Sequence, residues 1–278
     1  MRTMSYVCAT TGESIGFEGP AYGETMPALR GHAWSYRLGH RQVSGIALPG
    51  REATIGVKIV GYDELERMRI LFDADMVNRT PGTLVVDGEW RTAAYVAKAE
   101  PQSITPGMVE SQLTMLLPDP WWRRESLNVF HMQTFEDSQW LDLPCDLPCD
   151  LPCDLGGMAA IRTVRNPTPI RQPARITIYG PCTNPYVVIG ANRYQVDASV
   201  PEGGRIEIDG ASAVKTVVMV DAQGNRSNLF GKARRGAGLD GGEYIFQPLE
   251  PGIQQIAWRN DFDFDVTVVE ERTEPPWT

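Results

Sequence analysis

The sequence is poor in histidine and cysteine and has no long apolar run. Its 278 residues include three histidines and five cysteines. No stretch approaches the ~18 consecutive apolar residues that a membrane helix needs, and the N-terminus lacks the apolar core of a secretion signal. An odd number of cysteines suits a reducing compartment better than a disulfide framework. We therefore expect a soluble chain that does not insert into membranes and folds where it is made.

Positive charge is also in short supply. The chain has 26 Lys and Arg residues and 35 Asp and Glu residues, which gives a formal net charge of −9. This balance argues against a surface that tracks nucleic-acid phosphates or anionic lipids. It leaves room for a local basic patch such as Lys232, Arg234 and Arg235.

Turn-forming residues are abundant instead. The 27 glycines and 21 prolines make up about 17% of the chain, against roughly 12% in average proteins. Hydrophobic residues account for 42%, and the length suits two ordinary domains that each bury a core. Composition therefore favours a folded chain with many short strands over one built from long helices.

The first half is expected to form strands around a single helix. Apolar and polar residues alternate from Ala53 to Ile59, the pattern of a half-buried strand. The segment from Asp63 to Met76 follows as a helix, which Asp63 and Glu66 would begin as a capping box. The apolar residues that share one face of this helix are Leu65, Met68 and Phe72.

A hairpin and a pair of tryptophans come next. Residues Thr83 to Glu100 read as two strands joined by a tight turn at Asp87-Gly88. Another strand is expected from Val109 to Leu117, and Trp121-Trp122 follow shortly after it. Adjacent aromatics in a strand point to opposite faces, so one would serve the core and the other a contact surface.

The middle of the chain contains the only internal repeat, Leu-Pro-Cys-Asp three times from Leu143. Because each proline disfavours a helical residue before it, the run should be extended. We interpret residues 143–156 as a linker between an N-terminal domain, residues 1–142, and a C-terminal domain, residues 157–278. Cys145, Cys149 and Cys153 have a spacing that a zinc site allows. The repeat explains that spacing without metal, and shielded thiols are the interpretation we prefer.

Beyond the linker, short strands recur with turn signals between them. Apolar and polar residues alternate from Ala174 to Gly180. A hairpin is expected from Tyr186 to Val196, with its turn near Gly190 to Asn192. Further strands are expected to start near Arg205, Ala213, Glu243, Ile253 and Phe264. About seven or eight strands at this spacing predict a β-sandwich or barrel.

Three strings resemble catalytic or metal motifs without their context. Ser14 lies in a Gly-x-Ser-x-Gly string, but the residues after this string cannot form a helix. Residues 236–241 match Gly-x-Gly-x-x-Gly between a charged and a strand-like segment, where a surface loop is expected. The first ligand positions of a calcium-binding loop are matched by Asp261, Asp263 and Asp265, but the later positions of such a loop are not. We therefore expect these acids to be solvated side chains on a strand. We therefore expect no enzyme, cofactor or metal site.

The order of several strings resembles the distal tail protein family (Dit) of bacteriophages with long, non-contractile tails. The resemblance begins at Ser111-Gln112-Leu113-Thr114 with LLPDPWW after it, followed by the proline repeat. It continues through Tyr179 to Pro185, the segment from Asp221 to Asn228, and the ending Pro275-Pro276-Trp277. Leu and Cys stand where family repeats have aromatics.

This resemblance implies a mainly β protein with two β-sandwich domains. The N-terminal one would be tail-tube-like with one packed helix, and the C-terminal one galectin-like or carbohydrate-module-like. It implies a hexameric ring at the virion tail tip, assembled in the bacterial cytoplasm, that joins the tail tube to the hub or fibre protein. DNA would pass through the channel without specific binding, because acidic side chains that line the channel would repel its phosphates.

The alternative interpretation is a carbohydrate-binding module for host cell-wall glycan, in which Trp258, Tyr194 or Tyr244 would stack on a sugar. A hydrolase that uses Ser14 is the least favoured. The candidate contact residues are Asp87, Gly88, Trp90, Trp121, Trp122 and Trp258.

Overall fold

The computed structural model describes residues 3–18, 21–23, 27–29, 31–132 and 162–275. Its contacts divide the chain into two compact units. Unit 1 comprises Met1–Arg124 and Glu271–Thr278, and unit 2 comprises Glu125–Glu270. The predicted linker, residues 143–156 with its three cysteines, lies outside the described residues. The two domain boundaries that we placed at its ends lie there as well and stay a prediction. The boundary between the two compact units falls inside strand β10, between Arg124 and Glu125.

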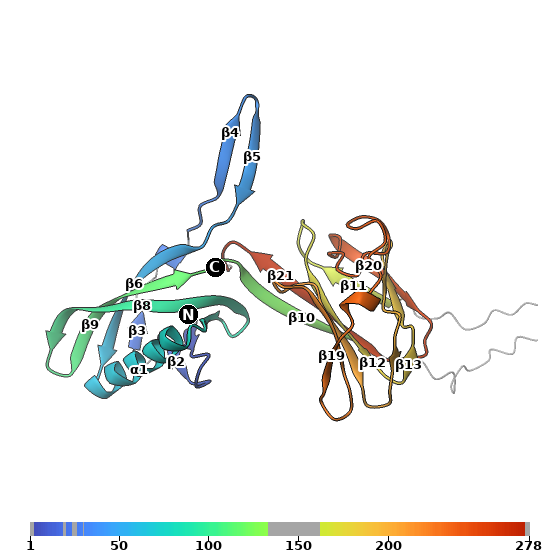
Figure 1. Ribbon diagram of the computed structural model, residues 1–278. Helices are drawn as coiled ribbons and strands as arrows, with labels where there is room; N and C mark the ends of the chain where they lie inside the picture. Colours follow the sequence, from blue (N-terminus) through green and yellow to red (C-terminus); the bar gives the residue numbers. More distant parts are fainter. Residues whose placement is uncertain (1–2, 19–20, 24–26, 30, 133–161, 276–278) are drawn as a thin grey trace, which may run out of the picture. The chain divides into compact units, whose positions relative to one another are not determined.

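Unit 1 consists of antiparallel strands and one α-helix (Figure 1). Its early strands are β1 (Met4–Val7), β2 (Ser14–Gly16), β3 (Ala21–Gly23), β4 (Ser35–Gly39), β5 (Gln42–Ala47) and β6 (Arg51–Val60). A 3₁₀ turn, η1, covers Pro27–Leu29. After helix α1 (Tyr62–Asn78) come β7 (Gly82–Val86), β8 (Trp90–Thr105), β9 (Met108–Leu117) and the start of β10 (Trp122–Phe130).

Strand β8 belongs to two sheets of unit 1. Its first residues pair with β7, which continues the order β2-β1-β7-β8. From Tyr95 onward it pairs with β9 in the order β3-β6-β9-β8. Register shifts after Val96 and Pro101 mark bulges in this long strand, and such bulges bend a strand and increase its twist. Buried residues of both sheets and of α1 form one core.

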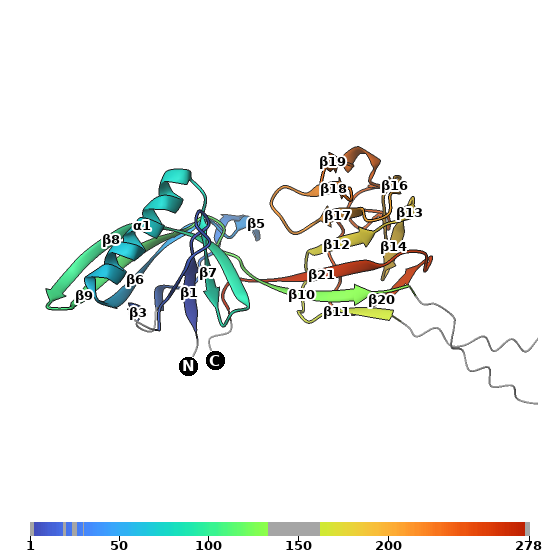
Figure 2. The ribbon, with the colours of Figure 1, turned by 90° about the horizontal axis from the view of Figure 1, so that it is seen from below.

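Helix α1 lies alongside the sheets of unit 1, as both ribbon views show (Figures 1 and 2). Met68 and Phe72 are buried and Leu65 packs against the core, which confirms the predicted face. The predicted capping box is wrong, because the helix begins one residue earlier and its N-cap is Gly61, without a side-chain cap. Gly61 has φ 91°, a conformation that glycine adopts without strain.

Unit 2 is built from two larger antiparallel sheets whose buried side chains form a single core. One has the strand order β19-β18-β17-β12-β21, with β10 beside β21. The other has the order β11-β20-β14-β15. The bounds are β11 (Arg162–Asn166), β12 (Ala174–Tyr179), β13 (Cys182–Thr183), β14 (Tyr186–Ile189), β15 (Asn192–Gln195), β16 (Ser199–Val200), β17 (Arg205–Asp209), β18 (Thr216–Val220), β19 (Arg226–Asn228), the 3₁₀ turn η2 (Phe230–Lys232), β20 (Gly252–Trp258) and β21 (Phe264–Arg272).

Most predicted strands are confirmed, including the hairpins β7–β8 and β14–β15. One is wrong: Glu243 to Phe246 forms turns rather than a strand. The side-chain oxygen of Asn192 accepts a hydrogen bond from the Tyr244 amide, and the Ile245 amide donates to the carbonyl of Arg234. These bonds to a side chain and a loop replace a strand ladder.

Candidate interaction surfaces

The predicted hairpin turn of unit 1 is present and exposed. Asp87 and Gly88 have φ angles of 53° and 71°, as a tight turn between strands requires. The Asp87 side chain accepts a hydrogen bond from the Thr3 amide at 3.1 Å, and the Asp87 amide donates to the carbonyl of Thr3. The turn is therefore fixed to the start of β1, and its contact with a partner remains a prediction.

Trp90 lies in the core of unit 1 between two arginines. Only 2% of its surface is exposed. The guanidinium groups of Arg124 and Arg272 each lie 5.1 Å from the ring centroid, within the range of cation–π attraction. Because Arg272 comes from the end of β21, this contact holds the returning chain to unit 1. Trp90 thus serves the fold, and its predicted partner contact is untested.

The adjacent tryptophans point to opposite faces, as predicted. Trp122 is fully buried, whereas Trp121 is half-buried. The Trp121 ring meets the edge of the exposed Trp34 ring, with centroids 5.9 Å apart. Trp34 directly precedes β4, so this aromatic pair lies at the base of the hairpin β4–β5.

The hairpin β4–β5 is an exposed surface that the sequence patterns did not predict. Every residue from 31 to 47 is exposed, and the hairpin stands out from the rest of unit 1 (Figure 1). Its exposed apolar side chains are Trp34, Tyr36, Leu38, Val43 and Ile46. Leu38 and Val43 are cross-strand neighbours, so they form a continuous apolar surface. The signal was available, because apolar residues flank the turn Gly39-His40-Arg41 on both sides.

This hairpin is also basic in an acidic protein. Residues 31–50 contain two arginines, two histidines and no acid. The remaining residues hold 24 of the 26 basic and all 35 acidic side chains, a net charge of −11. The hairpin is therefore opposite in net charge to the rest of the chain.

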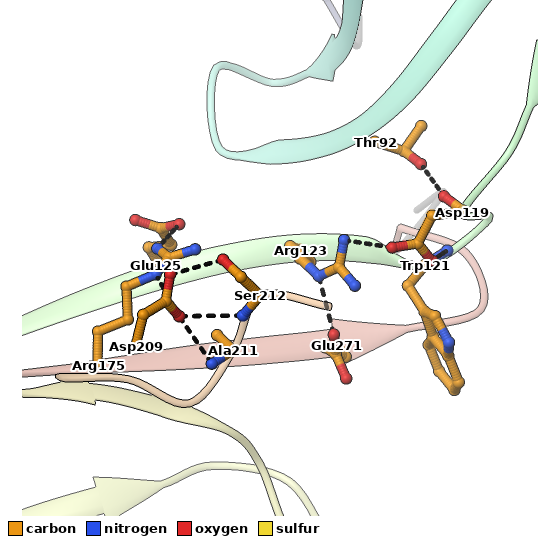
Figure 3. A network of polar contacts seen from close by, with 10 residues as sticks. All are labelled: Thr92, Asp119, Trp121, Arg123, Glu125, Arg175, Asp209, Ala211, Ser212 and Glu271. Carbon is orange, nitrogen blue, oxygen red and sulfur yellow. Dashed lines mark hydrogen bonds and ion pairs between the residues drawn. The ribbon is translucent and has the colours of Figure 1, made fainter. Parts of the chain in front are cut away.

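Arg123 ties three segments of unit 1 together (Figure 3). Its guanidinium group contacts the carboxylates of Asp119 and Glu271, each at 2.8 Å. Burial lowers the pKa of Arg123, but hydrogen bonds to these two carboxylates more than offset that and raise it. The carbonyl of Asp119 also accepts a hydrogen bond from Thr92 at 3.1 Å. These contacts fix the start of β10 beside the end of β21.

A second polar group lies in unit 2 (Figure 3). Arg175 pairs with Glu125 on β10 and with Asp209 on β17, the latter at 3.3 Å. Asp209 accepts further hydrogen bonds from the backbone amides of Ala211 and Ser212. The side chains are bound to one another, so the group acts as a brace between strands rather than as a reactive centre.

The aromatics proposed for sugar stacking are engaged within unit 2. Tyr194 is buried and donates a hydrogen bond to the carbonyl of Gln247. Trp258 is half-buried, donates to the carbonyl of Phe262, and packs against Phe130 and Phe264. The Tyr194 ring therefore has no exposed face for a sugar, whereas Trp258 and Tyr244, the third residue proposed for stacking, are both half-buried.

A hollow of about 130 Å³ lies nearby, lined by Asn192, Asp240, Gln247, Glu250 and Gln254 among others. Its volume is below the roughly 300 Å³ at which small-molecule sites begin. Asp240 and Glu250 both pair with Arg171, at 2.9 and 2.7 Å. Both acids of this hollow are therefore already paired with the same arginine.

The catalytic and metal strings do not assemble into sites. Ser14 begins the short strand β2, and no helix follows it. The three aspartates of 261–265 have separate partners, Arg259, His131 and Tyr179 respectively. Among the described residues no group of three His, Cys, Asp or Glu side chains is arranged to hold a metal ion. The described helices include none that is long and apolar enough to span a membrane.

One buried carboxylate, missed in the sequence, anchors the first strand of unit 1. Asp75 is fully buried near the end of α1. It accepts hydrogen bonds from the hydroxyls of Tyr6 and Thr10, at 2.7 and 2.8 Å, from the Cys8 thiol, and from the amides of Ala9 and Thr10. Burial raises its pKa, but these hydrogen bonds more than offset that and lower it. Asp75 lies three residues after Phe72 and seven after Met68, so the helical spacing places this acid on the buried face, and that is the signal that could have found it.

Comparison with solved structures gives full-length matches to phage tail proteins. A chain of the phage P2 baseplate in its activated conformation with Ca has a TM-score of 0.60 at 11% identity, covering 99% of this chain and 100% of that one. The crystal structure of SPP1 Dit has a TM-score of 0.54 at 12% identity, covering 98% and 99%. The phage P2 baseplate with Sr gives a TM-score of 0.59 at 11% identity, covering 99% and 100%.

No protein-family model matches this sequence. No curated protein matches it significantly either. The chain therefore has, over its whole length, the fold of a phage distal tail or baseplate protein, which confirms the resemblance at the level of the fold.

Proposed function

We propose that this chain is a structural component at the tip of a long, non-contractile phage tail. Six copies would close into a ring that connects the tail tube to the hub or fibre protein that meets the host. The full-length likeness to SPP1 Dit, described as part of a hub adsorption apparatus, supports this placement. The match to a baseplate chain supports it as well.

The hairpin β4–β5 is the observation that carries the proposal. An isolated two-stranded hairpin is marginally stable at best in water. This one exposes five large apolar side chains, and exposed apolar surface that extends over one element marks an interaction site. If a neighbouring copy covers the hairpin, each Å² of apolar surface that becomes buried stabilises the contact by about 25 cal/mol.

Charge favours a second copy of the chain as the covering partner. The hairpin has two arginines and no acid, and the remaining residues have a net charge of −11. A basic hairpin that docks on an acidic surface of the next copy forms a heterologous contact, in which two different patches meet. Such contacts generate rings when the rotation between copies closes.

The same proposal assigns a domain type to each of the two units. Unit 1, with strands around one packed helix, would be the tail-tube-like sandwich that forms the ring. Unit 2 would be the galectin-like sandwich. The acidic balance of the chain suits a channel that DNA passes without binding, because phosphates are repelled. The glycan alternative gains no support from Tyr194 and Trp258, whose rings are engaged internally.

Sedimentation of the purified chain, alone and with the tail tube protein of the same phage, tests the ring. We expect hexamers from the wild type and single copies from Leu38→Ser/Ile46→Ser. The matched control is Val214→Ser/Ile253→Ser, which removes two equally exposed apolar residues from unit 2 and should leave the hexamer intact. Single copies of the wild type under both conditions would contradict the proposal.

A further inference from the structure

The hairpin β4–β5 has one apolar face, which its strand register produces. Leu38 lies opposite Val43, so these two side chains share a face. The register shifts farther along, where Gly45 and Ile46 together oppose Tyr36 in a bulge. Because side chains alternate along each strand, Tyr36 and Ile46 lie on the same face as Leu38 and Val43. All four apolar side chains are exposed, so the face is continuous and uncovered.

Helix α1 also carries apolar side chains on the side away from its core. Met68 and Phe72 are buried on the inner side. The outer side consists of exposed residues at spacings of three and four, which lie in one row along a helix: Tyr62, Glu66, Ile70, Asp73 and Val77. We call these five residues the outer ridge. The outer side of a surface helix is normally polar, but Tyr62, Ile70 and Val77 are 53%, 58% and 80% exposed.

The hairpin and the outer ridge match each other in charge. Residues 31–50 contain two arginines and no acid. The outer ridge contains Glu66 and Asp73 and no cation, and the half-buried Arg69 borders it. Each surface therefore combines exposed apolar side chains with charges of the sign that the other lacks.

The two surfaces also match in length. From Tyr62 to Val77 the outer ridge extends over about 22 Å, since each helical residue adds about 1.5 Å. Strand β5 has six residues, which extend over about 20 Å at about 3.3 Å per residue. The hairpin is therefore long enough to cover most of the ridge.

We propose that the outer ridge of α1 receives the hairpin β4–β5 of the next copy of this chain. The inference rests on the proposed ring and adds to it the surface that receives the hairpin. Both surfaces are exposed in the same chain, so a copy does not cover its own ridge with its own hairpin. In a closed ring each copy gives its hairpin to one neighbour and its ridge to the other, and every patch is covered.

Apolar burial is expected to supply most of the stability of this contact. Each Å² of buried apolar surface contributes about 25 cal/mol, whereas an exposed ion pair contributes only about 0–1 kcal/mol. The opposite charges serve mainly to orient the two copies as they approach. Loss of apolar side chains from the ridge is therefore the change that tests the contact.

Sedimentation of the full-length chain, under the conditions in which the wild type forms hexamers, tests the inference. We expect Ile70→Ser/Val77→Ser to give single copies, as Leu38→Ser/Ile46→Ser does. The control Val214→Ser/Ile253→Ser should keep the hexamer. An equimolar mixture of the ridge variant and the hairpin variant should give pairs with one copy of each, because only one intact hairpin and one intact ridge can then meet.

The outcomes separate this inference from the ring on which it rests. Single copies of the wild type would contradict the ring itself. A wild-type hexamer that the hairpin variant abolishes and the ridge variant retains would overturn the receiving surface alone. A mixture that stays as single copies, or pairs formed by either variant by itself, would overturn it too. Matching thermal melting curves show that a loss of assembly is not a loss of fold.

Discussion

Two pairs of strands in unit 1 use apolar residues in opposite ways. In β6 and β9, apolar side chains such as Ile55 and Leu113 point inward and are buried against α1 and the second sheet. In β4 and β5, side chains such as Leu38 and Ile46 are 75% and 62% exposed. The first pair makes the unit fold, and the second contributes almost nothing to that core.

This difference is the reason for proposing that the hairpin makes a contact outside its own unit. Burial of a leucine-sized side chain stabilises a fold by about 1.5–3 kcal/mol. Several apolar side chains of the hairpin are exposed and therefore do not contribute this stabilisation. Exposed apolar strands are also a hazard for aggregation. A protein that keeps them gains only if a partner covers them, and the proposed ring provides that partner.

The largest effect is expected from an inward-facing residue. Leu84 on β7 is fully buried, and Leu84→Ala should reduce the free energy of unfolding by about 2–5 kcal/mol through lost burial and a cavity. Urea unfolding measured by circular dichroism checks this. A loss below about 1 kcal/mol would mean that the core of unit 1 is packed differently.

A smaller loss is expected where a polar group holds the core. Asp75→Asn removes the charge that five donors share and places an amide N–H₂ among them, which should cost about 1.5–3 kcal/mol. The exposed Asp73 on the same helix supplies the control, because Asp73→Asn should stay within about 0.5 kcal/mol. Equal effects of the two variants in urea unfolding would refute the anchoring role of Asp75.

The same carboxylate gives a pH dependence. Because the pKa of Asp75 is lower in the folded chain, its contribution is present above the unfolded value near 3.9 and is lost as the pH falls through the folded pKa. The stability difference between the wild type and Asp75→Asn should therefore shrink below about pH 4. Urea midpoints compared at pH 7 and pH 3 measure it, and a constant difference would be inconsistent with this assignment.

The smallest effect on stability is expected in the hairpin. Leu38→Ala makes the same chemical change as Leu84→Ala, but on an exposed side chain, so the isolated chain should lose no more than about 0.5 kcal/mol. Its effect should appear in assembly instead, as a weaker hexamer by sedimentation. A loss of stability as large as that of Leu84→Ala would remove the contrast between the two strand pairs.

Local patterns predicted much of the fold. Helix α1, the turn at Asp87-Gly88 and the hairpin β14–β15 follow from spacing and turn chemistry that act within a few residues. The opposite orientation of Trp121 and Trp122 follows from strand geometry in the same way.

The features that the sequence could not supply depend on distant partners. The segment from Glu243 to Phe246 looks strand-like, but Asn192 and Arg234, far away in the sequence, hold it in turns. The helical spacing places Asp75 on the apolar face of α1, but its hydrogen-bond partners Tyr6 and Thr10 come from a distant part of the sequence. Trp90 looks available for contact until Arg124 and Arg272 cover its ring.

Electron cryomicroscopy of the intact tail tip of the virion is the most direct measurement. A closed ring of six copies, with β4–β5 of each copy buried against the next, is the predicted result. Hairpins that stand free in solvent, or a chain present in the tip as a single copy, would contradict the account.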